Sequence, residues 1–229
     1  MNYELTKSYF YKVDETINYK RSVIMIIIGV VLLMIKGGQV IGIGLIALAI
    51  FLIVFRKNKI DKEKASIPSD TQYDNEVSKK LNGLKTMALS ELGLDEEEVK
   101  EIEPITFDGY VYKNAKNAKK GDDNLWRTNK YEYVILFFSK HEVHCFTYNF
   151  DTTLDKESKE TDVYFYKDIV SVSTAVESTT LLDQNVDYDY FKLTTAGGTA
   201  LSVSLRDVSN AQRSINAMRT LLKAKKQQG

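Results

Sequence analysis

Apolar and polar positions divide the chain into a short apolar part near its start and a longer part of mixed pattern. Two apolar runs lie between Ser22 and Phe55, and the segment KGGQ at 36–39 separates them. Each run is about 14–16 residues long and carries no charge, which is the short end of what crosses the hydrocarbon core of a bilayer. A helix in a soluble core needs a polar face, and neither run has one. The pattern therefore predicts a transmembrane helical hairpin over 22–55.

Basic residues around the two runs predict their orientation. Four precede the first run and five come after the second, whereas Lys36 alone lies in the turn. Segments with an excess of Lys and Arg stay in the cytoplasm, so we expect a multi-pass protein of the cell membrane with both termini inside. Residues 1–21 then form a cytoplasmic N-terminal segment and 56–69 a basic linker. Aromatic residues placed to lie in the head-group region are Tyr9, Phe10, Tyr11 and Tyr19.

A small-residue spacing in the second run indicates self-association. Gly38 and Gly42 are four residues apart, which allows two membrane helices to approach closely. A homo-oligomer is therefore one expectation. Gly38 also fits the turn, and the spacing then carries no such meaning.

Beyond Pro68 the pattern changes to that of amphipathic helices. Ser69 with Gln72, and later Asp95 with Glu98, have the spacing of a capping box, which marks a helix start. Between them apolar residues recur every three or four positions until Gly93, namely Tyr73, Val77, Leu81, Leu84 and Ala88. We predict a helical collar over 70–102 that packs on the C-terminal half of the chain.

From about residue 104 the pattern alternates with a period of two, which is typical of β-strands. The predicted strands are 104–112, 130–139, 142–150, 161–167, 169–176, 186–195 and 199–205. The period then becomes helical, with an apolar face formed by Val208, Ala211, Ile215, Met218 and Leu222. Ser209 and Gln212 offer a capping box for this C-terminal helix.

Seven antiparallel strands followed by one amphipathic helix resemble a pleckstrin-homology-like (PH-like) domain. The segment NLWRTNKYEYVILFF is similar to the Trp-basic-aromatic second strand of such domains, although the basic residue that normally follows the first Arg is absent. The segment VYFYKDIVSVS resembles the paired strands of bacterial PH-like and GRAM-like modules, with Tyr166, Asp168 and Ile169 at the corner between them. The resemblance covers 104–225. It implies an α+β fold with a partly open β-barrel over 103–229, one end of which the C-terminal helix closes.

Charge and composition narrow the functional classes. Residues 66–229 hold 21 basic and 26 acidic residues, a net charge of −5, which argues against nucleic-acid binding. The single Cys145 excludes an intrachain disulfide, and it has too few His or Cys neighbours for a tetrahedral metal site. No nucleotide-binding or nucleophile motif is present. We therefore expect no metal, no cofactor and no enzymatic activity.

One basic stretch lies between the first two predicted strands, at 111–127. Its basic residues are Lys113, Lys116, Lys119, Lys120 and Arg127. In lipid-binding members of the PH family this loop carries the head-group contacts, so the resemblance implies a candidate site for an anionic lipid or ligand. Asp122 and Asp123 offset part of the charge, and a solvated loop or a protein contact fits the same stretch.

These observations together predict a membrane-anchored cytoplasmic binding or adaptor module of bacterial type. It would recruit or sense a protein or an anionic ligand at the inner membrane surface, so its partners are the membrane, a protein and an anionic lipid. The alternative is a ligand-gated membrane effector, whose short hairpins oligomerise and disrupt the bilayer.

Overall fold

The computed structural model describes residues 1–14 and 19–228, and the chain divides into two compact units. Met1–Phe10 together with Asp70–Gly229 form the first, which we call the sheet unit. Tyr11–Ser69 form the second, which we call the helix-pair unit. The N-terminal segment expected over 1–21 is therefore divided, because its first ten residues belong to the sheet unit.

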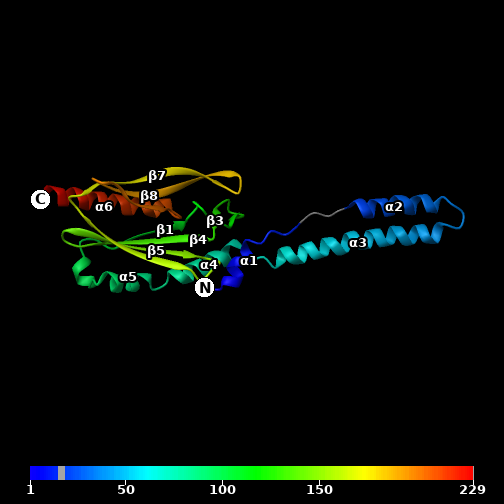
Figure 1. Ribbon diagram of the computed structural model, residues 1–229, viewed down its shortest axis with the longest axis horizontal. Coiled ribbons are helices and arrows are strands. Elements are labelled where there is room, and N and C mark those ends of the chain that lie inside the picture. Colours follow the sequence, from blue (N-terminus) through cyan, green and yellow to red (C-terminus); the bar gives the residue numbers. More distant parts are fainter. Residues whose placement is uncertain (15–18, 229) are drawn as a thin grey trace. The chain divides into compact units, whose positions relative to one another are not determined.

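The helix-pair unit contains α2 (Tyr19–Leu33) and α3 (Gln39–Ala65), which lie side by side (Figure 1). The two helices touch at a pair of glycines. A Cβ added to Gly42 would lie 2.6 Å from the carbonyl oxygen of Gly29, and one added to Gly29 would lie 2.8 Å from that of Gly42. Gly42 therefore serves the contact between α2 and α3 within one chain.

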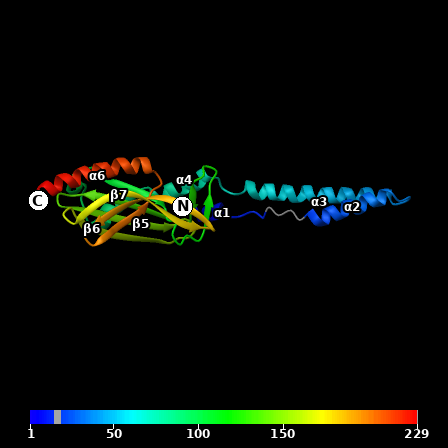
Figure 2. The same ribbon diagram turned by 90° about the horizontal axis from the view of Figure 1, so that it is seen from above.

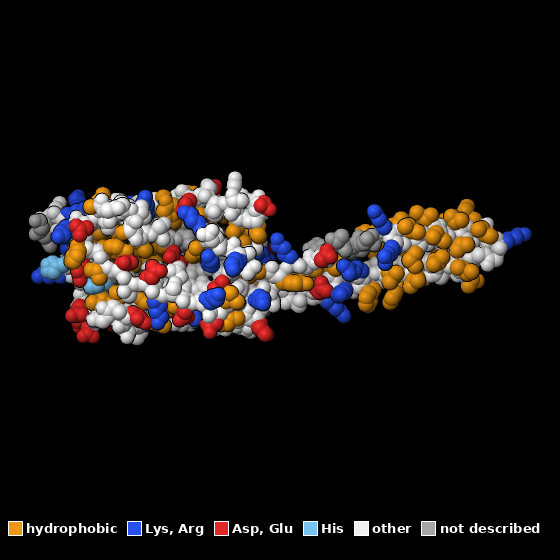
Figure 3. All heavy atoms as spheres, in the orientation of Figure 1, with side chains coloured by type: hydrophobic (Ala, Val, Ile, Leu, Met, Phe, Trp, Pro, Cys, Tyr) orange, Lys and Arg blue, Asp and Glu red, His pale blue; other side chains and the backbone are white. Residues whose placement is uncertain are grey.

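On the face that Figure 3 shows, apolar side chains cover most of the surface of α2 and of the part of α3 that lies beside it. The exposed ones include Ile27, Val31, Ile41, Phe51 and Phe55. Among the described residues, one helical stretch, which begins at Gln39, is long and apolar enough to cross a membrane by length and composition. Helix α2 has 15 residues. One of the two predicted spans thus meets these criteria.

The sheet unit has nine described strands in three antiparallel sheets. The first sheet has the order β1 (Ile105–Tyr110), β4 (Lys130–Phe138), β5 (Glu142–Asp151) and β6 (Glu157–Phe165). The second has the order β7 (Ile169–Leu181), β8 (Gln184–Thr195) and β9 (Gly198–Ser204). The short strands β2 (Ala118–Lys120) and β3 (Trp126–Thr128) pair with each other and were not predicted. The seven predicted strands are present with shifted ends, and the described strands do not close into a barrel.

The predicted corner between β6 and β7 exists, but the two strands are not paired. They belong to different sheets, so the corner carries the chain from one sheet to the other. The hydroxyl of Tyr166 donates a hydrogen bond to the carbonyl oxygen of Ser139 (2.7 Å), and Ile169 is fully buried. These two contacts hold the corner against the core.

The main core lies between the two larger sheets and α6 (Val208–Gln228). Four of the five expected positions on α6 are buried, whereas Val208 is exposed. The expected capping box at Ser209 and Gln212 is wrong. Asp207 caps the helix instead, because its carboxylate accepts the N–H of Asn210 at 3.0 Å. Figure 2 shows α6 running lengthwise along the sheet unit.

A second core lies on the other face of the first sheet (Figure 1). The helices that cover it are α1 (Tyr3–Tyr9), α4 (Asp70–Leu81), α5 (Leu84–Leu92) and the 3-10 helix Glu96–Val99. Tyr73, Val77, Leu84 and Ala88 are buried there, as the collar pattern predicts. Gly83, with a φ of +79°, divides the collar into two helices.

Candidate functional site

The N-terminal helix α1 belongs to the sheet unit, and its last residue is buried there. Asn2 caps the helix by accepting the N–H of Leu5 at 3.2 Å. The ring of Tyr9 stacks on that of Tyr73, with centroids 4.3 Å apart, and Tyr9 is fully buried. The prediction that Tyr9 lies in the head-group region is therefore wrong, because protein surrounds its ring.

Tyr9 also contacts the residue at which the chain returns to the sheet unit. Its hydroxyl donates a hydrogen bond to Asp70 Oδ1 at 2.7 Å. Tyr9 precedes the helix-pair unit in the chain by two residues, and Asp70 follows it directly. The chain therefore leaves the sheet unit and returns to it at neighbouring points.

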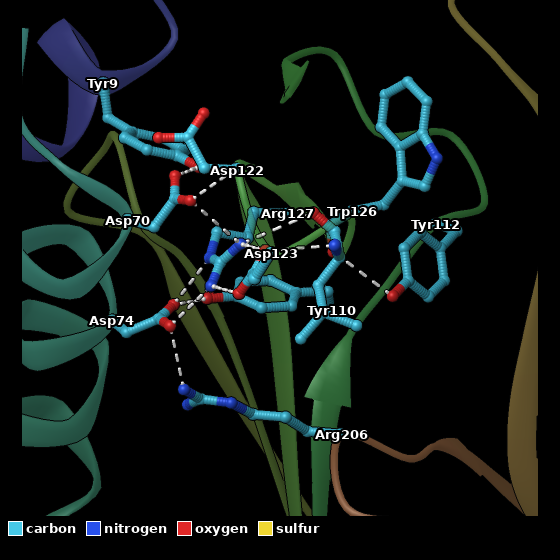
Figure 4. Close-up of polar contacts among 11 residues, drawn as sticks. Tyr9, Asp70, Asp74, Tyr110, Tyr112, Asp122, Asp123, Trp126, Arg127 and Arg206 are labelled. Atoms are coloured by element: carbon cyan, nitrogen blue, oxygen red, sulfur yellow. Dashed lines mark hydrogen bonds and ion pairs between the residues drawn. The ribbon is translucent and has the colours of Figure 1, made fainter. Parts of the chain in front are cut away.

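Arg127 lies beside this junction among three carboxylates (Figure 4). Its Nε and Nη2 donate to the two oxygens of Asp74 at 2.9 and 2.8 Å. Its Nη1 and Nη2 donate to the two oxygens of Asp123 at 2.9 and 2.7 Å. Its Nη1 lies 3.9 Å from Asp70 Oδ2. We call Tyr9, Asp70, Asp74, Asp123 and Arg127 the Arg127 clasp.

Other groups complete the hydrogen bonding of the clasp carboxylates. Tyr110 donates its hydroxyl to Asp74 Oδ1 at 2.7 Å, and Arg206 Nη2 lies 3.0 Å from Asp74 Oδ2. The backbone N–H of Asp122 donates to Asp70 Oδ2 at 2.8 Å. Helix α4 presents Asp70 and Asp74 one turn apart, which puts both on the same face. The clasp thus connects α1, α4, β3 and the β2–β3 turn, and its partners Tyr110 and Arg206 add β1 and the segment after β9.

Contacts in the clasp lower the pKa of Asp74 and of Asp123. Hydrogen bonds from Arg127 lower the pKa of Asp123 to about 2. Burial alone would raise the pKa of Asp74, but hydrogen bonds from Arg127 and Tyr110 outweigh it and lower that pKa. Arg127 is 3 % exposed, and its five N–H groups make five hydrogen bonds to protein oxygens. The guanidinium therefore has no donor left for an outside anion.

The four lysines of the expected ligand loop have different surroundings. Lys113 Nζ pairs with Glu177 at 2.5 Å, and Lys119 Nζ lies 4.1 Å from the centroid of the Tyr9 ring. Lys116 and Lys120 are exposed, and their ammonium groups form no ion pair with any residue that the structure describes. The structure thus places Lys119 and Arg127 at the clasp and leaves Lys116 and Lys120 as the lysines open to a ligand.

Sequence reasoning found the basic loop and missed the clasp. The partners of Arg127 and Tyr9 are distant along the chain, since Asp74 is 53 residues from Arg127 and Asp70 is 61 residues from Tyr9. The usable signal was the spacing of Asp70 and Asp74 on one face of a predicted helix, at the edge of the stripe that begins at Tyr73.

Other chemistry-bearing side chains do not gather into a site. In the part of the chain that the structure describes, no group of three or more His, Cys, Asp or Glu side chains is placed to hold a metal. His144 lies 3.3 Å from Glu142. Cys145 is buried, and burial raises the pKa of its thiol to about 12, so it is not a reactive thiolate.

Comparison with known proteins yields no match to a protein-family model, a curated protein or a solved structure. The function is therefore inferred from the residues and their geometry.

Proposed function

We propose that this chain is a membrane-anchored binding module whose sheet unit lies in the cytoplasm. The surface of the helix pair supports the anchoring. Apolar side chains on both helices are exposed, and apolar surface in water is unfavourable by about 25 cal/mol per Å². One helical stretch has the length and composition of a span. A bilayer is the solvent that suits such a surface.

The observation that carries the proposal is where the two ends of the helix-pair unit attach. Tyr9 and Asp70 are hydrogen-bonded to each other inside the sheet unit, and that unit cannot lie on both sides of a membrane. A chain that leaves the unit and returns to it must therefore cross the membrane an even number of times. If α3 crosses, α2 supplies the other crossing.

Helix α2 is short for this role. Its 15 residues extend about 22 Å at 1.5 Å per residue, against about 30 Å of hydrocarbon. Bilayers thin around short spans at a cost of fractions of a kcal/mol per Å. Nine basic residues on the two flanks of the pair, against Lys36 alone in the turn, favour flanks in the cytoplasm.

The sheet unit is the binding part of the proposal, and we assign it to the PH-like folds. Support comes from its two larger antiparallel sheets, the corner at Tyr166–Ile169 and the C-terminal helix in the core. Its role would be to recruit or sense a protein or an anionic ligand at the membrane.

Direct lipid contact through the basic loop has limited support. Lys116 and Lys120 are the two exposed lysines of the loop that form no ion pair with a described residue, and each is worth about 1 kcal/mol near an anionic membrane. Asp122 is exposed on the next turn and opposes them. A protein or a soluble anion is therefore favoured over lipid as the ligand.

Cysteine labelling in intact cells tests the anchoring and its orientation. In a Cys145→Ala background, Gly37→Cys should react with a membrane-impermeant maleimide, because it lies in the outer turn. Lys62→Cys should react only after permeabilisation. Labelling of Lys62→Cys in intact cells would reverse the orientation, and removal of the full chain from membranes by alkaline carbonate would refute the anchoring.

The second candidate function is the membrane effector that oligomerises through its hairpins. Gly44 favours it, because a Cβ added there would meet no heavy atom within 4 Å, so this small position on α3 faces open space. Gly42 does not favour the effector, since it already contacts Gly29 of the same chain. Release of a trapped dye from vesicles that contain the full chain would support the effector, and intact vesicles would support the binding module.

A further inference from the structure

A cleft of about 740 Å³ is lined by residues of the β4–β5 turn, the β6–β7 corner and the end of α6. The end of α6 lies at the opposite end of the sheet unit from α1 (Figure 1). The apolar side chains of the cleft are those of Phe165, Tyr166, Leu221 and Ala224. The titratable side chains at its lining are Glu101, Lys140, His141, Lys167 and Lys225. Its volume falls in the range of about 300–1,000 Å³ that is usual for small-molecule sites.

The charge of this cleft is opposite to that of the unit around it. Residues 1–10 hold one Lys and one Glu, and residues 70–229 hold 21 basic and 26 acidic residues, so the sheet unit carries −5. The lining holds three Lys and one Glu, a net charge of +2 before His141 is counted. Positive charge gathered in one cleft of an acidic unit raises the local concentration of anions.

Lys225 contacts three other residues that line the cleft. Its side chain is 12 % exposed, its Nζ lies 2.9 Å from Glu101, and it donates to the carbonyl oxygen of Lys140 at 3.0 Å. The same Nζ lies 5.5 Å from the centroid of the Tyr166 ring. These contacts connect α6 to the β4–β5 turn and neutralise Glu101, so the one carboxylate of the lining does not repel an anion.

Lys140 and Lys167 remain to bind a ligand. Both are exposed, and no ion pair engages either of them within residues 1–14 and 19–228. Lys167 Nζ lies 5.8 Å from the centroid of the Phe165 ring, on the apolar wall. Neither lysine is on α6, so the negative C-terminal end of that helix does not account for them.

We propose that this cleft binds a small soluble ligand that carries two or more phosphate groups. Ammonium groups bind phosphate as compact point charges, and Lys140 and Lys167 present two of them at the lining. Lys140 and Lys167 would hold the phosphates, and the wall at Phe165 and Leu221 would accept the apolar body of the ligand. The inference rests on the binding function proposed above and names the ligand class of that module.

Equilibrium dialysis of radiolabelled pyrophosphate against the full chain in a maltoside detergent tests this at low salt. We expect binding at one site per chain. One charge-assisted hydrogen bond corresponds to about tenfold in affinity, so Lys140→Gln or Lys167→Gln should weaken binding about tenfold and the pair about a hundredfold. The matched control is Lys7→Gln with Lys156→Gln, two exposed lysines outside both the cleft and the basic loop. It removes the same charge from the sheet unit and should change affinity less than about twofold.

The Ala224→Trp variant distinguishes pyrophosphate binding in the cleft from attraction to the charge of the surface in general. Ala224 is exposed on α6 and lines the cleft, so a large side chain there fills the space and removes no charge. It should abolish pyrophosphate binding.

Three results would overturn the proposal. They are failure of the wild type to bind pyrophosphate at low salt, equal binding by the two double variants, and binding only to vesicles of phosphorylated lipid. None of these results would alter the cysteine-labelling pattern, so failure of this inference is distinguishable from failure of the anchoring.

Discussion

Arg127 uses all five of its N–H groups on protein oxygens. Its removal would leave Asp123 without its ion-pair partner and Asp74 with Arg206 as its remaining cation. Breaking a buried ion pair from one side typically costs about 3–5 kcal/mol. We expect Arg127→Ala to lower the free energy of unfolding by about that amount, measured by circular dichroism during chemical unfolding. The stability of Arg127→Lys should lie between those of the wild type and Arg127→Ala, because an ammonium group cannot form two bidentate pairs.

Arg213→Ala is the matched control, since Arg213 is an exposed arginine on α6. It should leave the unfolding midpoint unchanged. An Arg127→Ala protein as stable as the control would mean that the clasp contributes nothing to stability, and Arg127 would again be a candidate ligand contact.

Glu132 on β4 should make stability depend on pH. Burial and the charge of Glu160 raise the pKa of Glu132 to about 7, above the usual 4.5. Between these values the folded protein holds a proton that the unfolded chain releases, so the free energy of unfolding falls as pH rises, by up to about 3 kcal/mol. Glu132→Gln should therefore stabilise the protein at pH 8 and change little below pH 4.5. Thermal unfolding across this range measures the difference.

The partner carboxylate supplies the control for this prediction. Glu160→Gln removes one of the two causes of the raised pKa, so its pH dependence should be intermediate between wild type and Glu132→Gln. If Glu132→Gln is no more stable than wild type at pH 8, the side chain of Glu132 is better hydrated than its burial indicates.

At the scale of elements, the contact between α2 and α3 depends on the absence of side chains at Gly29 and Gly42. A large residue at Gly42 would overlap the backbone of α2, and overpacking of this kind typically costs about 1–3 kcal/mol. Gly42→Leu should therefore separate the helices at a lower dodecyl sulfate fraction in mixed micelles, followed by circular dichroism.

Gly44→Leu is the control on the same helix, because a Cβ there meets no heavy atom within 4 Å. It should leave the transition in place. Equal effects of the two substitutions would show that bulk on α3, and not the contact with Gly29, decides the stability of the pair.

The elements themselves were largely predictable. Collar positions, strand alternation and the face of α6 depend on side chains a few residues apart, and local periodicity reports these directly. The errors occur where a nearby residue changes the backbone. Gly83 breaks one expected helix into two, and Asp207 caps α6 ahead of the expected Ser209.

At the scale of the whole molecule, the helix-pair unit is inserted between two parts of one compact unit. Joining Phe10 to Asp70 by a short Gly-Ser linker, with 11–69 removed, should give a protein that is soluble without detergent and folded by circular dichroism. A variant that starts at Asp70 loses α1 and uncovers Tyr73. It should be less stable than the linked protein by about 3 kcal/mol, the usual cost of removing a buried aromatic side chain.

Equal stability of these two soluble variants would contradict the place of α1 in the sheet unit. A linked protein that still needs detergent would mean that apolar surface outside the helix pair also requires a membrane or a partner.

Patterns along the chain were sufficient for the apolar runs, their charge asymmetry, the two kinds of period and the basic loop. Each of these features depends mainly on residues close in sequence and on the surrounding solvent. The place of α1, the clasp and the basic cleft depended on folding. Tyr9 and Asp70 are 61 residues apart, and Lys225 is 85 residues from the carbonyl that it binds. Residue type indicates that a buried charge needs a partner, whereas the packing of several distant elements selects which partner it finds.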